Sequence, residues 1–172
     1  FKPFVIAAAL EAGIPPGWTV NANSGQVIEG CSGPDGEYSP NNAGGDGIHD
    51  MYSGVKQSVN VFHAKLASEI GPTTVADMAG RLGLRTWDDF HANTDPAYRF
   101  IGCSIGLGAT DVTPLEMASA YATFANRGEY CAPYAVERIE AADGRVLYEH
   151  SNDCERVVGQ DVVDRVVDIM QG

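Results

Sequence analysis

Apolar residues recur with helical spacing in five stretches, which together predict a mostly helical chain. The stretches are residues 3–12, 55–70, 74–82, 113–126 and 161–170. In the second stretch, apolar side chains follow one another at steps of four, three, four and four, which places them on one face of a helix: Val55, Val59, Phe62, Leu66 and Ile70. The first stretch is apolar and alanine-rich throughout, as expected of a buried helix.

Start and stop signals give several of these helices their ends. The Thr-Pro-Leu-Glu run at 113–116 forms a capping box with proline at the first helical position, and Gly128 closes the helix that follows. We expect Tyr121 and Phe124 on this helix to lie in the core. We expect Thr74 to be the N-cap of a helix that stops at Gly83. The first helix is expected to end at Gly13.

Two other regions have the composition of loops and strands. The segment 17–47 is rich in glycine, proline, asparagine and serine, which predicts loops and short hairpins. A further hairpin is predicted near 134–150, with strands at Tyr134–Glu140 and Val146–His150 around an Ala-Asp-Gly turn. Helices and hairpins together indicate an α+β fold.

Length and charge narrow the class of protein. A chain of 172 residues is about the size of one domain, and its 44% hydrophobic residues are typical of a globular protein. The formal net charge of −12 and the scattered basic residues argue against nucleic-acid binding. The chain opens in a helix-like run without the features of a signal peptide, so we expect it to be a fragment of a longer protein.

Histidine spacing gives no sign of a metal centre. The four histidines are His49, His63, His91 and His150, and no H-x-H or H-x-x-x-H pattern occurs among them. We therefore expect structural or surface histidines, no metal and no cofactor.

Four cysteines lie at positions 31, 103, 131 and 154, and none has the C-x-x-C spacing of a zinc or redox site. Disulfides are then the leading interpretation, and they indicate an exported protein. Folding of the 134–150 hairpin would bring Cys131 near Cys154, which leaves Cys31 to pair with Cys103. The alternative is four reduced, buried cysteines in a cytosolic protein.

Candidate chemistry comes from Lys2 and from Ser58-Val59-Asn60, which begins 56 residues later. A lysine can accept a proton at neutral pH when it is desolvated, and a serine hydroxyl reacts when such a base is within hydrogen-bond reach. Serine and asparagine also favour helix caps and turns. The sequence therefore allows two interpretations of this region: one long helix, or one helix that ends at the motif and another that starts there.

Several motifs in order resemble one family, the transpeptidase domain of class A penicillin-binding proteins. They are Phe1-Lys2-Pro3-Phe4, Tyr38-Ser39-Pro40-Asn41-Asn42, Gly54-Val55-Lys56-Gln57-Ser58-Val59-Asn60, Gly106-Leu107-Gly108 and Thr113-Pro114-Leu115-Glu116-Met117-Ala118-Ser119-Ala120-Tyr121. The resemblance spans nearly the whole chain. It implies the mostly helical part of the serine β-lactamase and penicillin-binding-protein fold.

The family pattern is S-x-x-K, then S-x-N, then K-T-G, with the first serine as nucleophile. Lys2 matches the lysine of S-x-x-K, whose serine would precede Phe1. The other lysines are Lys56 and Lys65, so the chain holds no K-T-G motif. By resemblance, residues 1–172 are a partial transpeptidase domain, with a glycosyltransferase domain before it and the K-T-G part after it or in a separate chain. We expect the 172 residues alone to be inactive.

The resemblance also implies roles for three residues. Lys2 would be the general base, Ser58 a proton relay, and Asn60 a hydrogen-bond partner of Lys2 and of the substrate backbone. The whole protein would be a membrane-anchored, extracytoplasmic enzyme that cross-links peptidoglycan stem peptides through a serine acyl-enzyme and binds β-lactam antibiotics. The alternatives are a class B transpeptidase, a D,D-carboxypeptidase, a β-lactamase, or a catalytically degenerate module that binds peptidoglycan or proteins.

Overall fold

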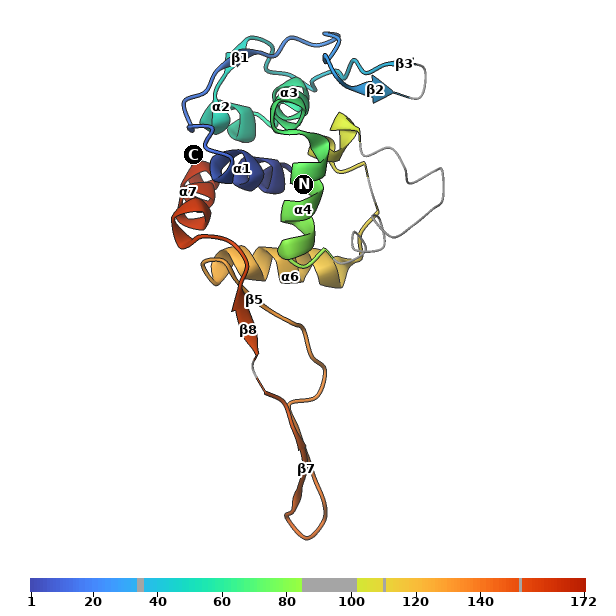
Figure 1. Ribbon diagram of the computed structural model, residues 1–172, viewed down its shortest axis with the longest axis vertical. Helices are drawn as coiled ribbons and strands as arrows, with labels where there is room; N and C mark the ends of the chain where they lie inside the picture. The colour runs from blue at the N-terminus through green and yellow to red at the C-terminus, as the bar shows by residue number, and fades with distance from the viewer. Residues whose placement is uncertain (34–35, 85–101, 110, 152) are drawn as a thin grey trace.

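The computed structural model describes residues 1–33, 36–84, 102–109, 111–151 and 153–172 (Figure 1). Its helices are α1 (Lys2–Glu11), α2 (Met51–Lys56), α3 (Asn60–Ile70), α4 (Pro72–Arg81), the 3-10 helix η3 (Cys103–Leu107), α6 (Pro114–Ala125) and α7 (Gln160–Gln171). None of these described helices has the length and apolar character needed to cross a bilayer. His91, one of the four histidines, lies outside the described residues.

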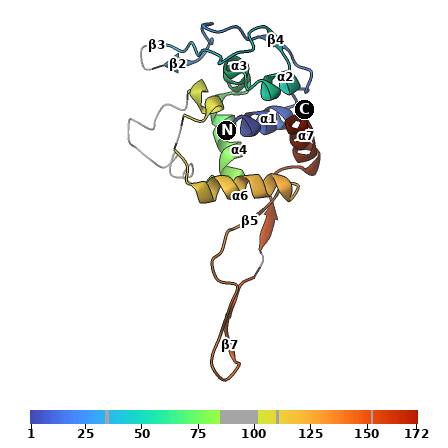
Figure 2. The same ribbon diagram turned by 180° about the vertical axis from the view of Figure 1, so that it is seen from behind.

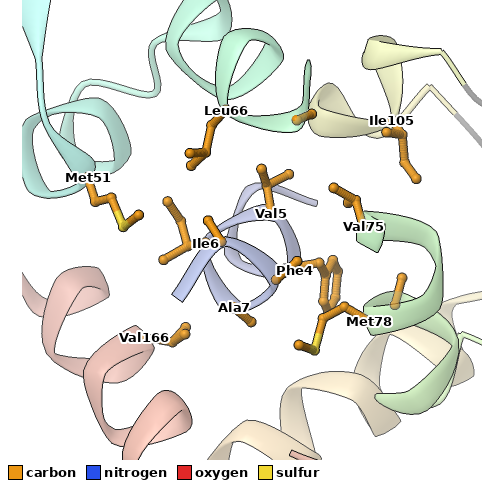
Figure 3. Close-up of a cluster of buried hydrophobic side chains, with 14 of the residues drawn as sticks. Phe4, Val5, Ile6, Ala7, Met51, Leu66, Val75, Met78, Ile105 and Val166 are labelled. Atoms are coloured by element: carbon orange, nitrogen blue, oxygen red, sulfur yellow. The ribbon is translucent and has the colours of Figure 1, made fainter. Parts of the chain in front are cut away.

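Helix α1 is the centre of the core. Its residues 3–9 are all buried, and the helix contacts α2, α3, α4, α7 and η3. In Figure 3 the side chains of Phe4, Val5 and Ile6 radiate from α1, with Phe4 directed towards Met78 and Ile6 towards Met51. A helix with no polar side chain over two turns can be covered on every side, so α1 provides a rigid base for the residue at its start.

The strands form four separate antiparallel pairs. β1 (Val20–Asn21) pairs with β4 (Ile48–His49), and β2 (Ser32–Gly33) pairs with β3 (Gly36–Glu37). β5 (Glu129–Cys131) pairs with β8 (Cys154–Arg156), and β6 (Arg138–Glu140) pairs with β7 (Val146–Glu149). The last two pairs form an arm that projects from the helical body in both views (Figures 1 and 2).

Most of the predicted elements are present. The capping box of α6 is confirmed, since Thr113 Oγ1 accepts from Glu116 N at 3.2 Å and Glu116 Oε2 accepts from Thr113 N at 2.9 Å. The predicted hairpin near 134–150 is β6–β7, with a first strand shorter than expected.

Two of the sequence predictions are wrong. Helix α4 begins at Pro72, because proline suits the first helical position, and the Thr74 hydroxyl donates to Ile70 O at 2.8 Å instead of capping. Tyr121 was expected in the core beside Phe124. Phe124 is buried, but 40% of the surface of Tyr121 is exposed.

Both predicted cysteine pairs are brought together. Cys131 and Cys154 face each other in the β5–β8 register with Cα atoms 4.3 Å apart, and they form a disulfide at the base of the arm. Cys31 and Cys103 form the second disulfide, with Cα atoms 5.7 Å apart. This second bond links the loop after β1 to η3, two segments that are distant in sequence.

Candidate active site

The S-x-N motif lies in a break between two helices. Helix α2 ends at Lys56 and α3 begins at Asn60, which decides between the two interpretations that the sequence left open. Ser58 has a φ of 54°, in the left-handed region that non-glycine residues rarely adopt. Holding it there costs about 1–2 kcal/mol, and such strain is often found at functional sites.

Backbone hydrogen bonds fix this turn. Ser58 N donates to Val55 O at 3.0 Å, and Val59 N donates to Gly54 O at 2.9 Å. Val59 is fully buried, while Ser58 is exposed. The turn therefore anchors Val59 in the core and presents the preceding side chain, Ser58, at the surface.

Lys2 reaches this turn from the first position of α1. Its Nζ donates to Ser58 Oγ at 2.7 Å, to Ser58 O at 2.6 Å and to Asn60 Oδ1 at 3.0 Å. An ammonium has three donors, so these contacts satisfy all of them. The structure thus places Lys2, Ser58 and Asn60, the three candidate catalytic residues, in one cluster.

The surroundings of Lys2 shift its titration towards lower pH. Burial lowers the pKa of Lys2 below its ordinary value of 10.5. Its three acceptors are a hydroxyl, a backbone carbonyl and an amide, all of which are uncharged. They orient the amine without adding a carboxylate that would hold the proton on it. The cluster can therefore pass a proton between an amine and a hydroxyl.

Asn60 is itself held by a second segment. Its Nδ2 donates to Asn41 O at 2.8 Å, and the neighbouring Asn42 Oδ1 accepts from Val61 N at 2.9 Å. In the sequence, these two asparagines were part of a family motif and had no assigned role. The available signal was an Asn-Asn pair in a loop upstream of S-x-N, but only the fold reveals that the two segments meet.

The described histidines do not contribute to this cluster as metal ligands. His63 is fully buried in α3 with Nδ1 2.7 Å from Val59 O, and burial lowers its pKa to about 3. His49 is buried with Nε2 2.5 Å from Gly45 O. Within the described residues, no group of three or more histidine, cysteine, aspartate or glutamate side chains is arranged to hold a metal ion.

Comparison with known proteins identifies the family of this chain. The profile of the family described as "Penicillin binding protein transpeptidase domain" matches residues 1–172. Penicillin-binding protein 2a of Streptococcus pneumoniae serotype 2 is 33% identical over 127 residues, which cover 72% of this chain and 17% of that protein. Penicillin-binding protein 1A of Mycobacterium tuberculosis is 32% identical over 181 residues, which cover 99% of this chain and 21% of that protein.

Solved structures agree on the fold. The penicillin-binding protein PonA1 from Mycobacterium tuberculosis superposes with a TM-score of 0.79 at 27% identity, over 98% of this chain and 44% of that one. PonA1 in complex with penicillin V gives a TM-score of 0.74 at 28% identity, with the same coverage. The chain spans about a fifth of the length of the curated relatives it matches. It belongs to the transpeptidase domain family of the class A penicillin-binding proteins.

Proposed function

We propose that this chain is part of a peptidoglycan D,D-transpeptidase, and that Lys2, Ser58 and Asn60 are catalytic residues. The observation that carries the proposal is the position of Lys2 Nζ, 2.7 Å from Ser58 Oγ and 3.0 Å from Asn60 Oδ1. A desolvated lysine beside a serine hydroxyl is the arrangement that acyl transfer by a serine and lysine pair needs. Membership of the transpeptidase family supports this reaction over other uses of the same pair.

In the first step, neutral Lys2 accepts the proton of the nucleophilic serine, which we place three positions before Lys2 in the longer protein. Residues three apart on a helix lie on the same face, so a continuation of α1 would hold that hydroxyl close to Nζ. The serine oxygen then attacks the carbonyl carbon of the bond between the two terminal D-alanines of a stem peptide.

Ser58 serves as the proton relay in this scheme. Its Oγ accepts from Lys2 Nζ, so it can receive the proton from Lys2 while donating its own to the nitrogen of the departing D-alanine. The reverse path takes a proton from the acceptor amine when that amine attacks the acyl-enzyme. Asn60 orients Lys2 through Oδ1 without changing the charge of the site.

The same serine would be acylated by β-lactams, since opening of the lactam ring mimics the first step. The penicillin V complex of PonA1 supports this extension. We further propose that the whole protein is anchored in the cell membrane with this domain outside the cytoplasm, and disulfides at Cys31–Cys103 and Cys131–Cys154 fit an oxidising compartment.

Labelling of the full-length protein by a fluorescent penicillin tests the proposal. Lys2→Ala and Ser58→Ala should each slow labelling by at least about 100-fold, the range expected for loss of general acid-base catalysis. Lys56→Ala is the matched control, because Lys56 is an exposed lysine at the end of α2 near the same turn. It should label at the wild-type rate. Wild-type labelling in both the Lys2 and Ser58 variants would disprove the assigned roles.

A further inference from the structure

The amide of Asn60 has a defined orientation because of its contact with the loop before α2. A backbone carbonyl can only accept a hydrogen bond, so Asn41 O selects the Nδ2 end of the Asn60 amide, at 2.8 Å. The Oδ1 end must then face Lys2 Nζ, where it accepts at 3.0 Å. If the amide were reversed, Nδ2 would face the donors of Lys2 and that hydrogen bond would be lost.

Asn42 holds the Asn41 carbonyl in place. Its Oδ1 accepts from Val61 N in the first turn of α3 at 2.9 Å, which joins the loop to the helix that carries Asn60. Its Nδ2 donates to Ala22 O at 2.6 Å, and Ala22 is fully buried. One side chain thus links the start of α3 to the chain just after β1.

Two further residues hold Asn42. Asp46 Oδ1 accepts from Asn42 Nδ2 at 2.9 Å, from Ser24 Oγ at 2.8 Å and from Ser24 N at 3.0 Å. Ser24 Oγ in turn accepts from Asn42 N at 3.0 Å, which closes the network. Hydrogen bonds from Asn42 and Ser24 lower the pKa of the Asp46 carboxyl, so it stays charged and a strong acceptor.

The same loop also passes close to the turn that precedes Ser58. Gly45 has a φ of 77°, and a Cβ built there would lie 2.7 Å from Gln57 Oε1. The loop therefore contacts the motif on both sides of Ser58, at Gln57 and at Asn60.

We propose that Asn42 is a positioning residue for the transfer reaction, which fixes the Asn60 amide so that Oδ1 accepts from Lys2. This rests on the proposed function. Asn42 acts through Asn60, since it hydrogen-bonds the backbone of α3 beside Asn60 while its neighbour Asn41 holds the amide.

Loss of this constraint has a predictable effect on the base. The Oδ1 contact stabilises the charged form of Lys2, because an acceptor oxygen favours an ammonium over an amine. When the amide is free to turn, Lys2 loses one of its three acceptors. The pKa of Lys2 then falls further, so the midpoint of the rise of the acylation rate with pH moves to lower pH. The rate also falls, because the amine is no longer held in one position.

A double-mutant cycle in the full-length protein tests whether Asn42 acts through Asn60. The measurement is the second-order rate constant of acylation by penicillin V for Asn42→Ala, Asn60→Ala and the double variant. We expect Asn42→Ala to be about 10-fold slower than wild type, and the double variant to be within about 2-fold of Asn60→Ala, because residues that act as a unit are not additive. Asn23→Ala changes an exposed asparagine in the segment between β1 and β2, and it should match the wild type.

A second variant covers the case in which Asn42→Ala fails to fold. Asp46→Ala removes an exposed carboxylate and loosens the network but leaves the Asn42 contact to Val61 intact. Asp46→Ala should also move the midpoint of the rise of the acylation rate to lower pH, by less than Asn42→Ala does. The thermal unfolding midpoint of each variant shows whether it is folded.

The outcomes separate this inference from the proposed function. Three results would each overturn the positioning role. The double variant could be slower than Asn60→Ala by the full factor found for Asn42→Ala. Asn42→Ala could react at the wild-type rate, or the pH profile could be unshifted in both loop variants. Wild-type acylation by Asn60→Ala and Lys2→Ala would instead overturn the proposed function itself. A slow Asn60→Ala with an equally slow double variant supports both.

Discussion

Mild acid should destabilise this domain through His63. The residue is fully buried in α3, where Nδ1 lies 2.7 Å from Val59 O and the ring packs edge-on against Phe62. A protonated imidazole at this position would have to lose its hydration. For this reason burial lowers the pKa of His63 from 6.5 to about 3.

The sign and the size follow from this pKa. The pKa is lower in the folded state, so between pH 6.5 and about 3 the unfolded chain binds a proton that the folded chain does not. Stability is therefore complete above pH 6.5 and is lost progressively as the pH falls. At about 1.4 kcal/mol per pH unit, the loss is about 2 kcal/mol by pH 5 and about 5 kcal/mol by pH 3.

Urea unfolding of the wild type and of His63→Asn at pH 7.5 and pH 5.0 measures this loss. Asparagine is the suitable replacement because its Nδ2 lies near the place of the histidine Nδ1, so it can donate to Val59 O without titrating. Carboxylates such as Asp46 and Asp50, whose pKa values are lowered by hydrogen bonds, act in both proteins and cancel in the comparison.

Between the two pH values, the wild type should lose about 2 kcal/mol more than His63→Asn. The variant will be less stable at pH 7.5, because the smaller side chain leaves a cavity. That constant difference does not affect the result. Equal losses in the two proteins would refute the assigned pKa of His63 and its cause.

Three other predictions concern stability. Replacing Cys31 and Cys103 by serine should cost about 4 kcal/mol in urea unfolding, because the bond closes a loop across a separation of 72 residues; a cost below about 1 kcal/mol, or free thiols at both positions by non-reducing mass spectrometry, would contradict the pairing. Gly54→Ala should lower the thermal midpoint by several degrees, because the new Cβ would lie 2.5 Å from the ring of Phe62; an unchanged midpoint would contradict that close approach. Thr113→Ala should cost about 1 kcal/mol by loss of the capping box, measured by urea unfolding, and a neutral change would contradict its contribution.

Local signals explain which parts of the fold could be predicted from the sequence. The capping box at Thr113 and the turn near Asp143 act over a few residues, so their elements lie where the pattern puts them. The start of α4 was misplaced because Pro72 and Thr74 both carry start signals, and proline at the first position prevailed. Tyr121 is half exposed because its distance from the core depends on how α6 packs, which periodicity alone does not determine.

The candidate site also contains some features that the sequence could predict and others that it could not. Lys2, Ser58 and Asn60 were candidates from the sequence, and a family resemblance implied their roles. The fold places them within hydrogen-bond distance of one another. The left-handed backbone at Ser58 could not be predicted, because serine gives no sign of a positive φ. The contribution of Asn42 was also hidden, since its contact with Val61 spans 19 residues and depends on the path of an irregular loop.

The pH dependence of β-lactam acylation tests the central claim, that Lys2 is the base of the transfer reaction. For the full-length wild type, the second-order rate constant for penicillin V should rise with pH along the titration of one proton. Its midpoint should lie below the ordinary lysine value of 10.5, since burial lowers the pKa of Lys2. In Lys2→Ala this rise should disappear together with most of the rate. A Lys2→Ala protein that keeps both the wild-type rate and the same rise with pH would contradict the account.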